Sequence, residues 1–161
     1  MCLGRLVLTS KDARRLPAGK SPRSGGAASG SRLRRRAGVI LIVDDTSDTL
    51  ELYSLYLTGR GFKVPTARDG LSGIDAAQRL QPDLIVMDLS MPGLDGIEAT
   101  RRLKADPRTA HIPILILTAY PLKAVKGGAL EAADGFLTKP CLPDSLERHI
   151  QRLLVRRRSG Q

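Results

Sequence analysis

Aromatic residues are scarce in this chain of 161 residues: they make up 3% of it, and tryptophan is absent. Hydrophobic residues nevertheless reach 42%, so we expect a packed core built from aliphatic side chains. Long apolar runs are also missing, because none approaches the roughly 18 to 20 residues that span a bilayer. The apolar stretch near the N-terminus is short and interrupted by charges, which makes it a poor secretory signal. These absences argue against a transmembrane protein and a secreted one.

Cysteine and histidine are equally rare, with two of each. Cys2 and Cys141 do not suggest a disulfide framework, and no group of cysteines and histidines has the spacing of a zinc site. His111 and His149 each lack a partner residue, so neither is a good phosphate donor. We therefore expect reduced thiols and a cytoplasmic location.

Positive charge is abundant, but it is concentrated at one end. Residues 1–38 contain ten Lys or Arg and a single acid, a net charge of +9. Residues 39–161 contain sixteen Lys or Arg and fifteen acids, a net charge of +1. The Gly, Ser and Arg composition of 1–37 predicts a disordered tail, because such a segment buries too little apolar surface to order itself. A functional alternative for the tail is salt-sensitive attraction to nucleic acid or anionic lipid.

Five segments are predicted to be β-strands. Residues 39–45, 83–89 and 113–119 are continuous aliphatic runs, which suit strands buried on both faces. Residues 63–67 and 135–139 are shorter candidates. In the first of these, Pro65 cannot donate a hydrogen bond to a neighbouring strand, so we expect it at the edge of the sheet.

Helical spacing of apolar residues predicts helices at 46–62, 69–81, 97–106 and 121–134, and a closing helix from Pro143. The predicted inner faces are Leu50, Tyr53 and Leu57 in the first helix, Leu71, Ile74 and Leu80 in the second, and Leu146, Ile150 and Leu153 in the last. Alternating strands and helices indicate an α/β fold, a doubly wound five-stranded parallel sheet with helices on both faces. In such sheets ligands bind beyond the carboxyl ends of the strands.

Charged and polar side chains stand at the ends of the predicted strands. Asp44 and Asp45 end the first strand, Asp88 the third, Thr118 the fourth and Lys139 the fifth. Because neighbouring parallel strands point the same way, we expect these side chains to meet at one edge of the sheet. Three carboxylates this close need a compensating cation, and hard oxygens without His or Cys indicate Mg²⁺ or Mn²⁺. A lysine and a hydroxyl opposite the metal suit a phosphoryl group, so Asp88 is predicted to form an acyl phosphate.

Four motifs in order, "ILIVDD", "LIVMDLSMPGLDG", "LTA" and "DGFLTKP", resemble the receiver domains of two-component response regulators. The resemblance covers about residues 38–157, which leaves a short tail at 158–161. It implies the flavodoxin-like strand order 2-1-3-4-5. It also implies the following roles: Asp88 as phospho-acceptor, Asp45 as a direct Mg²⁺ ligand, Asp44 as a ligand largely through water, Ser90 as a ligand through its backbone carbonyl, Thr118 and Lys139 as contacts of the phosphoryl group, Phe136 as a switch aromatic whose rotamer follows Thr118, and a cis Lys139–Pro140 peptide.

The resemblance implies a signalling switch rather than an enzyme. The phosphoryl group would come from a histidine kinase or a phosphotransfer protein, and the signal would leave through the helix 4–strand 5–helix 5 face of the family. No room is left after Arg158 for a DNA-binding output domain, so we expect output through a partner protein. Tyr120, two residues after Thr118, is expected to shield the acyl phosphate from attacking water.

Three other functions stay open on the sequence. A Mg²⁺-dependent phosphatase with an aspartyl nucleophile would need a general acid two residues after Asp88, and Ser90 at that position argues against it. A nucleic-acid-associated regulator would act through the basic tail. A receiver that signals by dimerising would need no output domain, and we expect a monomer or a weak homodimer.

Overall fold

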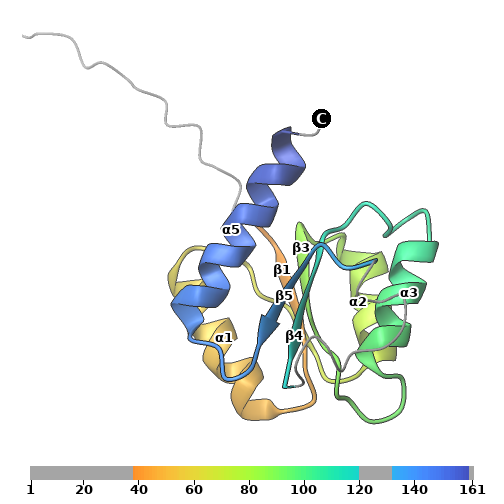
Figure 1. The fold of residues 1–161 in the computed structure, drawn as a ribbon, viewed down its shortest axis with the longest axis horizontal. Helices are drawn as coiled ribbons and strands as arrows, with labels where there is room; N and C mark the ends of the chain where they lie inside the picture. Colours follow the sequence, from red (N-terminus) through yellow and green to blue (C-terminus); the bar gives the residue numbers. More distant parts are fainter. Residues whose placement is uncertain (1–37, 120–131, 160–161) are drawn as a thin grey trace, which may run out of the picture. The chain divides into compact units, whose positions relative to one another are not determined.

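The computed structural model describes residues 38–119 and 132–159. The predicted tail at 1–37, Tyr120 and nearly all of the predicted helix at 121–134 lie outside the described residues. Figure 1 shows one sheet with helices on both of its faces. In chain order the elements are β1 (Ile40–Val43), α1 (Ser47–Gly59), β2 (Thr66–Ala67), α2 (Gly70–Leu80), β3 (Leu84–Asp88), α3 (Gly96–Ala105), β4 (Ile114–Thr118), β5 (Gly135–Thr138) and α5 (Pro143–Ser159).

The five strands are parallel and lie in the order β2-β1-β3-β4-β5, which confirms the predicted fold. β2 is shorter than expected, but it lies at the edge that Pro65 favours. The Pro65 carbonyl accepts a hydrogen bond from the Ile42 N–H at 3.0 Å. A residue without an N–H thus joins the pairing through its oxygen alone.

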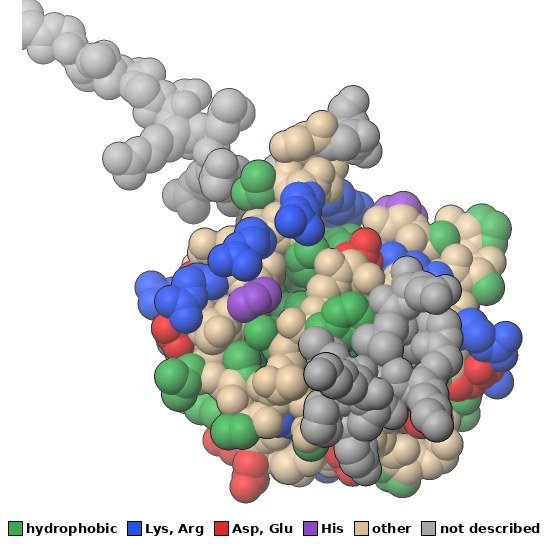
Figure 2. Space-filling model, viewed as in Figure 1, with side chains coloured by type: hydrophobic (Ala, Val, Ile, Leu, Met, Phe, Trp, Pro, Cys, Tyr) green, Lys and Arg blue, Asp and Glu red, His purple; other side chains and the backbone are tan. Residues whose placement is uncertain are grey.

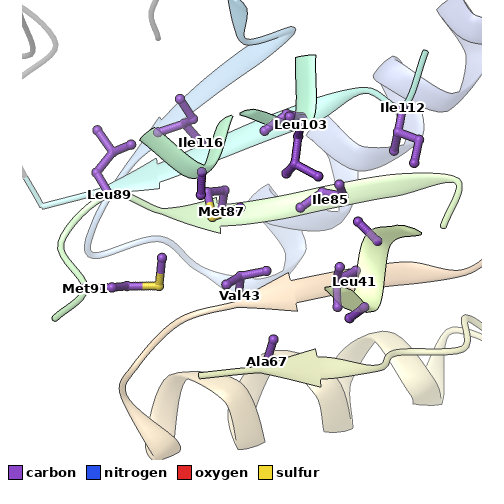
Figure 3. Packing of buried hydrophobic residues seen from close by; sticks show 14 residues of the cluster. Leu41, Val43, Ala67, Ile85, Met87, Leu89, Met91, Leu103, Ile112 and Ile116 are labelled. Carbon is purple, nitrogen blue, oxygen red and sulfur yellow. The ribbon is translucent and has the colours of Figure 1, made fainter. Parts of the chain in front are cut away.

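Both faces of the sheet are buried, because the central strands are aliphatic on both sides. Leu41 and Val43 of β1 face the layer of α2 and α3, whereas Ile40 and Ile42 face the layer of α1 and α5. Figure 1 shows these two helix pairs on opposite sides of the sheet, and Figure 3 shows the cluster on the α2–α3 side. The polar carboxyl ends of the strands therefore stand on a rigid aliphatic platform.

The inner face predicted for α2 is wrong for its two leucines. Leu71 is 61% exposed and Leu80 is 41% exposed, and the buried residues of the helix are Gly70, Gly73, Ala76 and Ala77. The reason is the short distance between α2 and β1, since a Cβ at Gly73 would lie 2.9 Å from Val43 Cγ1. Only a face of small residues allows this approach, so the larger side chains turn outward.

The faces predicted for the other two helices are confirmed. Leu50, Tyr53 and Leu57 of α1 are buried, as are Leu146, Ile150 and Leu153 of α5. α5 continues to Ser159, two residues beyond the expected end of the domain. The Lys139–Pro140 peptide before this helix is cis, as the resemblance implies. None of the described helices is long and apolar enough to cross a membrane.

Candidate functional site

The polar residues predicted at the strand ends meet at the carboxyl edge of the sheet. Val43 of β1 is paired in register with Met87 of β3, so Asp44 and Asp88 follow side by side. Asp88 is in turn paired with Leu117 of β4, next to Thr118. The parallel register thus brings residues from distant parts of the chain to one place.

Three carboxylates form the centre of this edge. Asp44, Asp45 and Asp88 each offer one oxygen, and these oxygens lie within 4.8 Å of one another. Asp44 is 1% exposed and Asp88 4% exposed, whereas Asp45 is open to solvent. The cluster is therefore sunk into the edge of the sheet and can be reached from the side of Asp45.

Lys139 reaches this cluster from the end of β5. Its Nζ donates to Asp44 Oδ2 at 2.6 Å and lies 3.3 Å from Asp88 Oδ1. The second oxygen of Asp44 accepts a hydrogen bond from the Thr46 N–H at 2.9 Å. The ammonium group thus serves two acids and lies nearer to Asp44, whereas the sequence had suggested only its role toward a phosphoryl group.

The pKa values follow from this crowding. Burial raises the pKa of Asp88, and so does the charge of Asp44, while Lys139 and the backbone N–H of Ser90 lower it without cancelling the rise. Burial lowers the pKa of Lys139, but its hydrogen bond to Asp44 and its attraction to Asp88 outweigh this and leave that pKa above its ordinary value. Lys139 therefore stays charged, and the ionised form of Asp88 is held at a cost in free energy.

A tight turn fixes the chain after Asp88. A Cβ at Gly96 would collide with the backbone carbonyl of Asp88, so this position accepts no side chain. The Gly96 N–H donates to the Leu89 carbonyl at 3.1 Å, and Asp95 caps α3 by accepting from the Glu98 N–H at 2.8 Å. The loop is thereby folded back onto the strand that carries Asp88. The sequence marked this loop by its Pro and Gly content but did not single out Gly96.

The remaining predicted residues lie around the cluster. Thr118 is fully buried at the end of β4, and its carbonyl accepts a hydrogen bond from the Lys139 N–H at 2.7 Å. Ser90 is exposed on the loop two residues after Asp88. Phe136 lies within β5, half-buried, and packs against the cluster on the α2–α3 side. Tyr120, predicted to shield the site, lies outside the described residues.

One further residue supports the site, and the sequence did not identify this role. The hydroxyl of Tyr53 on α1 donates to the carbonyl of Cys141 at 2.8 Å, two residues after Lys139. This bond ties α1 to the loop that follows Lys139. Burial raises the pKa of Tyr53 to about 12, with smaller contributions from Cys141 and Asp44, so the phenol remains a donor. The sequence marked Tyr53 as core only, because no local signal joins residues 88 positions apart.

The donor set fits a hard divalent cation. Three carboxylates converge, no cysteine or histidine belongs to the group, and Lys139 is the one lysine in the described part of the chain that pairs with Asp44 and Asp88. Two of the acids are buried, so negative charge is left without full compensation inside the edge of the sheet. Mg²⁺ suits such a set, since it takes a few carboxylate oxygens and keeps several waters.

Comparisons with known proteins all identify the same family. The model of the response regulator receiver domain family matches residues 40–151. Among curated relatives, response regulator PleD of Caulobacter vibrioides is 42% identical over 102 residues, which are 63% of this chain and 22% of PleD. The chain thus spans about a fifth of the length of that relative.

Solved structures agree with the family match. Chemotaxis response regulator CheY4 of Vibrio cholerae has a TM-score of 0.68 and 30% identity, covering 73% of this chain and 98% of that one. The receiver domain of sensor histidine kinase PA1611 from Pseudomonas aeruginosa has a TM-score of 0.68 and 32% identity, with the same coverage of both chains. That structure has a magnesium ion coordinated in its active site cleft.

Proposed function

Because this chain belongs to the response regulator receiver domain family of two-component signalling, we propose that it accepts a phosphoryl group on Asp88 and transmits a signal by changing conformation. The observation that carries the proposal is the convergence of three carboxylates and Lys139 at the carboxyl edge of the sheet. A cluster of acids beside one ammonium group suits the binding and transfer of a phosphoryl group.

Asp88 is proposed as the nucleophile. One of its carboxylate oxygens forms a bond to phosphorus while the bond from phosphorus to the donor breaks, and the electron pair of that bond leaves with the donor. The strand and the close contact with Gly96 keep Asp88 in place, so little orientation has to be gained during the reaction. The product is an acyl phosphate on a buried strand end.

Asp44, Asp45 and Asp88, together with the backbone carbonyl of Ser90, would hold Mg²⁺ at this site. When bound, the ion supplies positive charge that balances the acids and polarises the phosphoryl group. The magnesium in the active site cleft of the PA1611 receiver domain supports this part of the proposal.

Lys139 is proposed to contact a phosphoryl oxygen. It already lies between Asp44 and Asp88, so a small shift away from Asp44 brings its ammonium group to the new charge. Thr118 would donate to another phosphoryl oxygen. Phe136 lies two residues along the chain from Thr138, the register partner of Thr118, so it is placed to respond to a movement of that threonine.

Receiver domains are signalling switches, and the proposed donor is a histidine kinase or a phosphotransfer protein. We assign the receiver domain to residues 38–157, with output through the surface of β5, α5 and the predicted helix at 121–134. The phosphatase alternative receives no support from the site, because a serine hydroxyl at Ser90 is too weak an acid to protonate a leaving group.

The proposal is tested by incubating the protein with acetyl phosphate and Mg²⁺ and measuring intact mass. We expect a gain of one phosphoryl group in the parent and none in Asp88→Asn. Asp83→Asn is the matched control, because Asp83 immediately precedes the same strand at its opposite end. Asp83→Asn should gain the phosphoryl group like the parent. Phosphorylation of Asp88→Asn, or turnover of a phosphomonoester by the parent, would refute the assignment.

A further inference from the structure

The outward face of α5 carries an unusual density of arginine. Arg148, Arg152 and Arg156 follow one another at intervals of four residues, so they lie on one side of the helix. All three are exposed, and we call them the arginine ridge. Figure 2 shows blue side chains gathered along α5 in the view of Figure 1. The ridge contrasts with residues 39–161 as a whole, whose net charge is only +1.

The ridge is poorly neutralised within its own chain. Arg148 has a partner in Asp144 at 3.4 Å, an exposed pair of little energetic value. Arg152 and Arg156 form no ion pair with any residue in 38–119 or 132–159. Like charges four residues apart repel each other, so the ridge costs the helix a little stability. An anion laid along the helix would relieve that repulsion.

The ridge ends at a hollow of about 280 Å³ near the last turns of α5. Its lining consists of His111, Pro113, Asp134, Leu153, Arg156 and Arg157. The acid in this lining is already neutralised, because Asp134 pairs with Lys104 at 2.8 Å and accepts from the Ile114 N–H at 2.8 Å. Arg156 is exposed at the rim, so the hollow extends the positive surface.

We propose that the arginine ridge binds the phosphodiester backbone of a nucleic acid without reading its bases. The ridge extends about 12 Å along the helix axis, a length over which one strand of a duplex carries about three or four phosphates. Each guanidinium can bind a phosphate through two parallel hydrogen bonds. The acidic edge of the sheet repels a polyanion, and residues 39–161 have a net charge of only +1, so local groups of cations such as the ridge supply the attraction in this part of the chain. Such binding requires no phosphoryl group on Asp88.

The experiment uses the full chain and a fluorescein-labelled DNA duplex of about 20 base pairs, with anisotropy measured between about 50 and 200 mM salt. In Arg152→Gln/Arg156→Gln we expect affinity to fall about tenfold at the lowest salt. The slope of log affinity against log salt should become shallower by about 2, one for each lost phosphate contact.

Arg101→Gln/Arg102→Gln is the matched control, because it removes the same formal charge from α3. These two arginines are exposed, but both pair with Glu98, at 2.7 and 2.8 Å. The control should bind within about twofold of the parent. Equal losses in the two variants, or no loss in the ridge variant, would overturn the proposal.

A poly-glutamate peptide of equal charge serves as competitor. If it displaces the duplex as well as unlabelled DNA does, the ridge is a site for acidic protein segments and the nucleic-acid proposal is wrong. Thermal melting checks that both variants fold. Phosphorylation of Asp88 by acetyl phosphate is measured on the same samples, so a failure of DNA binding is distinguished from a failure of the proposed receiver function.

Discussion

The two edges of the sheet both carry aspartates, but the aspartates differ in burial and in whether each one has a cation of its own. At the amino edge, Asp83 accepts the Val39 N–H at 2.8 Å and lies 3.6 Å from Arg157. Asp134 likewise accepts a backbone N–H and pairs with its own lysine. At the carboxyl edge, Asp44 and Asp88 share the ammonium group of Lys139, and no other cation in 38–119 or 132–159 pairs with Asp44, Asp45 or Asp88.

The difference separates acids that hold the fold together from the acids that we propose to be reactive. An acid with one amide and a cation that it does not share is satisfied, so its charge contributes to stability. Acids that outnumber their cations repel one another, and their ionisation costs stability unless something positive binds. Burial and the sharing of one cation, rather than residue type, distinguish the two edges. Four predictions test this comparison.

The largest effect is expected from adding a methyl group beside each edge. In Gly96→Ala the new Cβ meets the backbone carbonyl of Asp88, which cannot move without displacing β3, so we expect a loss of about 3 kcal/mol or more in the free energy of unfolding. In Gly135→Ala the Cβ would lie 3.1 Å from Leu115 Cδ1, the end of a flexible side chain. That variant should stay within about 1 kcal/mol of the parent. Urea denaturation measures both.

Next in size is the response to magnesium. If the carboxyl edge is short of cations, Mg²⁺ at 100 times its dissociation constant should stabilise the parent by about 2.7 kcal/mol. Asp45→Asn removes one ligand and should lower the affinity at least about 100-fold, which reduces this gain to about 0.4 kcal/mol or less. Asp134→Asn, at the amino edge, should keep the whole response. Thermal melting with Mg²⁺ and with EDTA measures the stabilisation of each variant. Equal responses of the two variants would contradict the proposed difference between the edges.

Removing one charge from each edge should change stability in opposite directions. Asp134→Ala leaves the Ile114 N–H and Lys104 without their acceptor, so we expect a loss of about 1 to 2 kcal/mol. Asp88→Asn in EDTA removes a buried carboxylate whose ionised form is unfavourable, so we expect a gain of about 1 kcal/mol. Chemical denaturation at neutral pH measures both changes. Destabilisation by both substitutions would mean that the acids at the two edges play the same role.

The smallest effect is a dependence on pH in the absence of metal. The folded pKa of Asp88 is raised above 3.8, so its protonated form favours folding, and that contribution is lost as pH rises from 3.8 through the folded pKa. The advantage of Asp88→Asn over the parent should therefore shrink toward zero near about pH 4. The opposite case is Asp106, where hydrogen bonds from Arg108 lower the pKa to about 2, so its contribution is lost as pH falls from 3.8 toward that value. A pH-independent advantage would contradict the account of Asp88.

Much of this arrangement could be predicted from the sequence, because strands with aliphatic residues on both faces are easy to recognise and a parallel sheet brings their ends together. The sequence alone therefore predicts that Asp44, Asp88 and Lys139 lie at one edge. It could not foresee that Lys139 lies nearer to Asp44 than to Asp88, since both acids are within reach of a flexible side chain.

Close packing of the backbone was the second feature that the sequence could not predict. Helical spacing favoured Leu71 and Leu80 as the inner face of α2, but the short distance at Gly73 reverses that choice. The importance of Gly96 could not be predicted for the same reason. Glycine is common in turns, and the contact of Gly96 with Asp88 is visible only in three dimensions. Such contacts depend on how closely two elements approach, and a one-dimensional pattern carries no measure of that distance.

The bond between Tyr53 and the Cys141 carbonyl gives this molecule a built-in optical reporter. With no tryptophan in the chain, ultraviolet emission comes from three tyrosines alone, and one of them touches the backbone two positions past Lys139. Any displacement of that lysine on acquiring a phosphoryl group should alter the emission of Tyr53, whose pKa burial raises to about 12. The proposed activation could thus be followed in real time without attaching a dye.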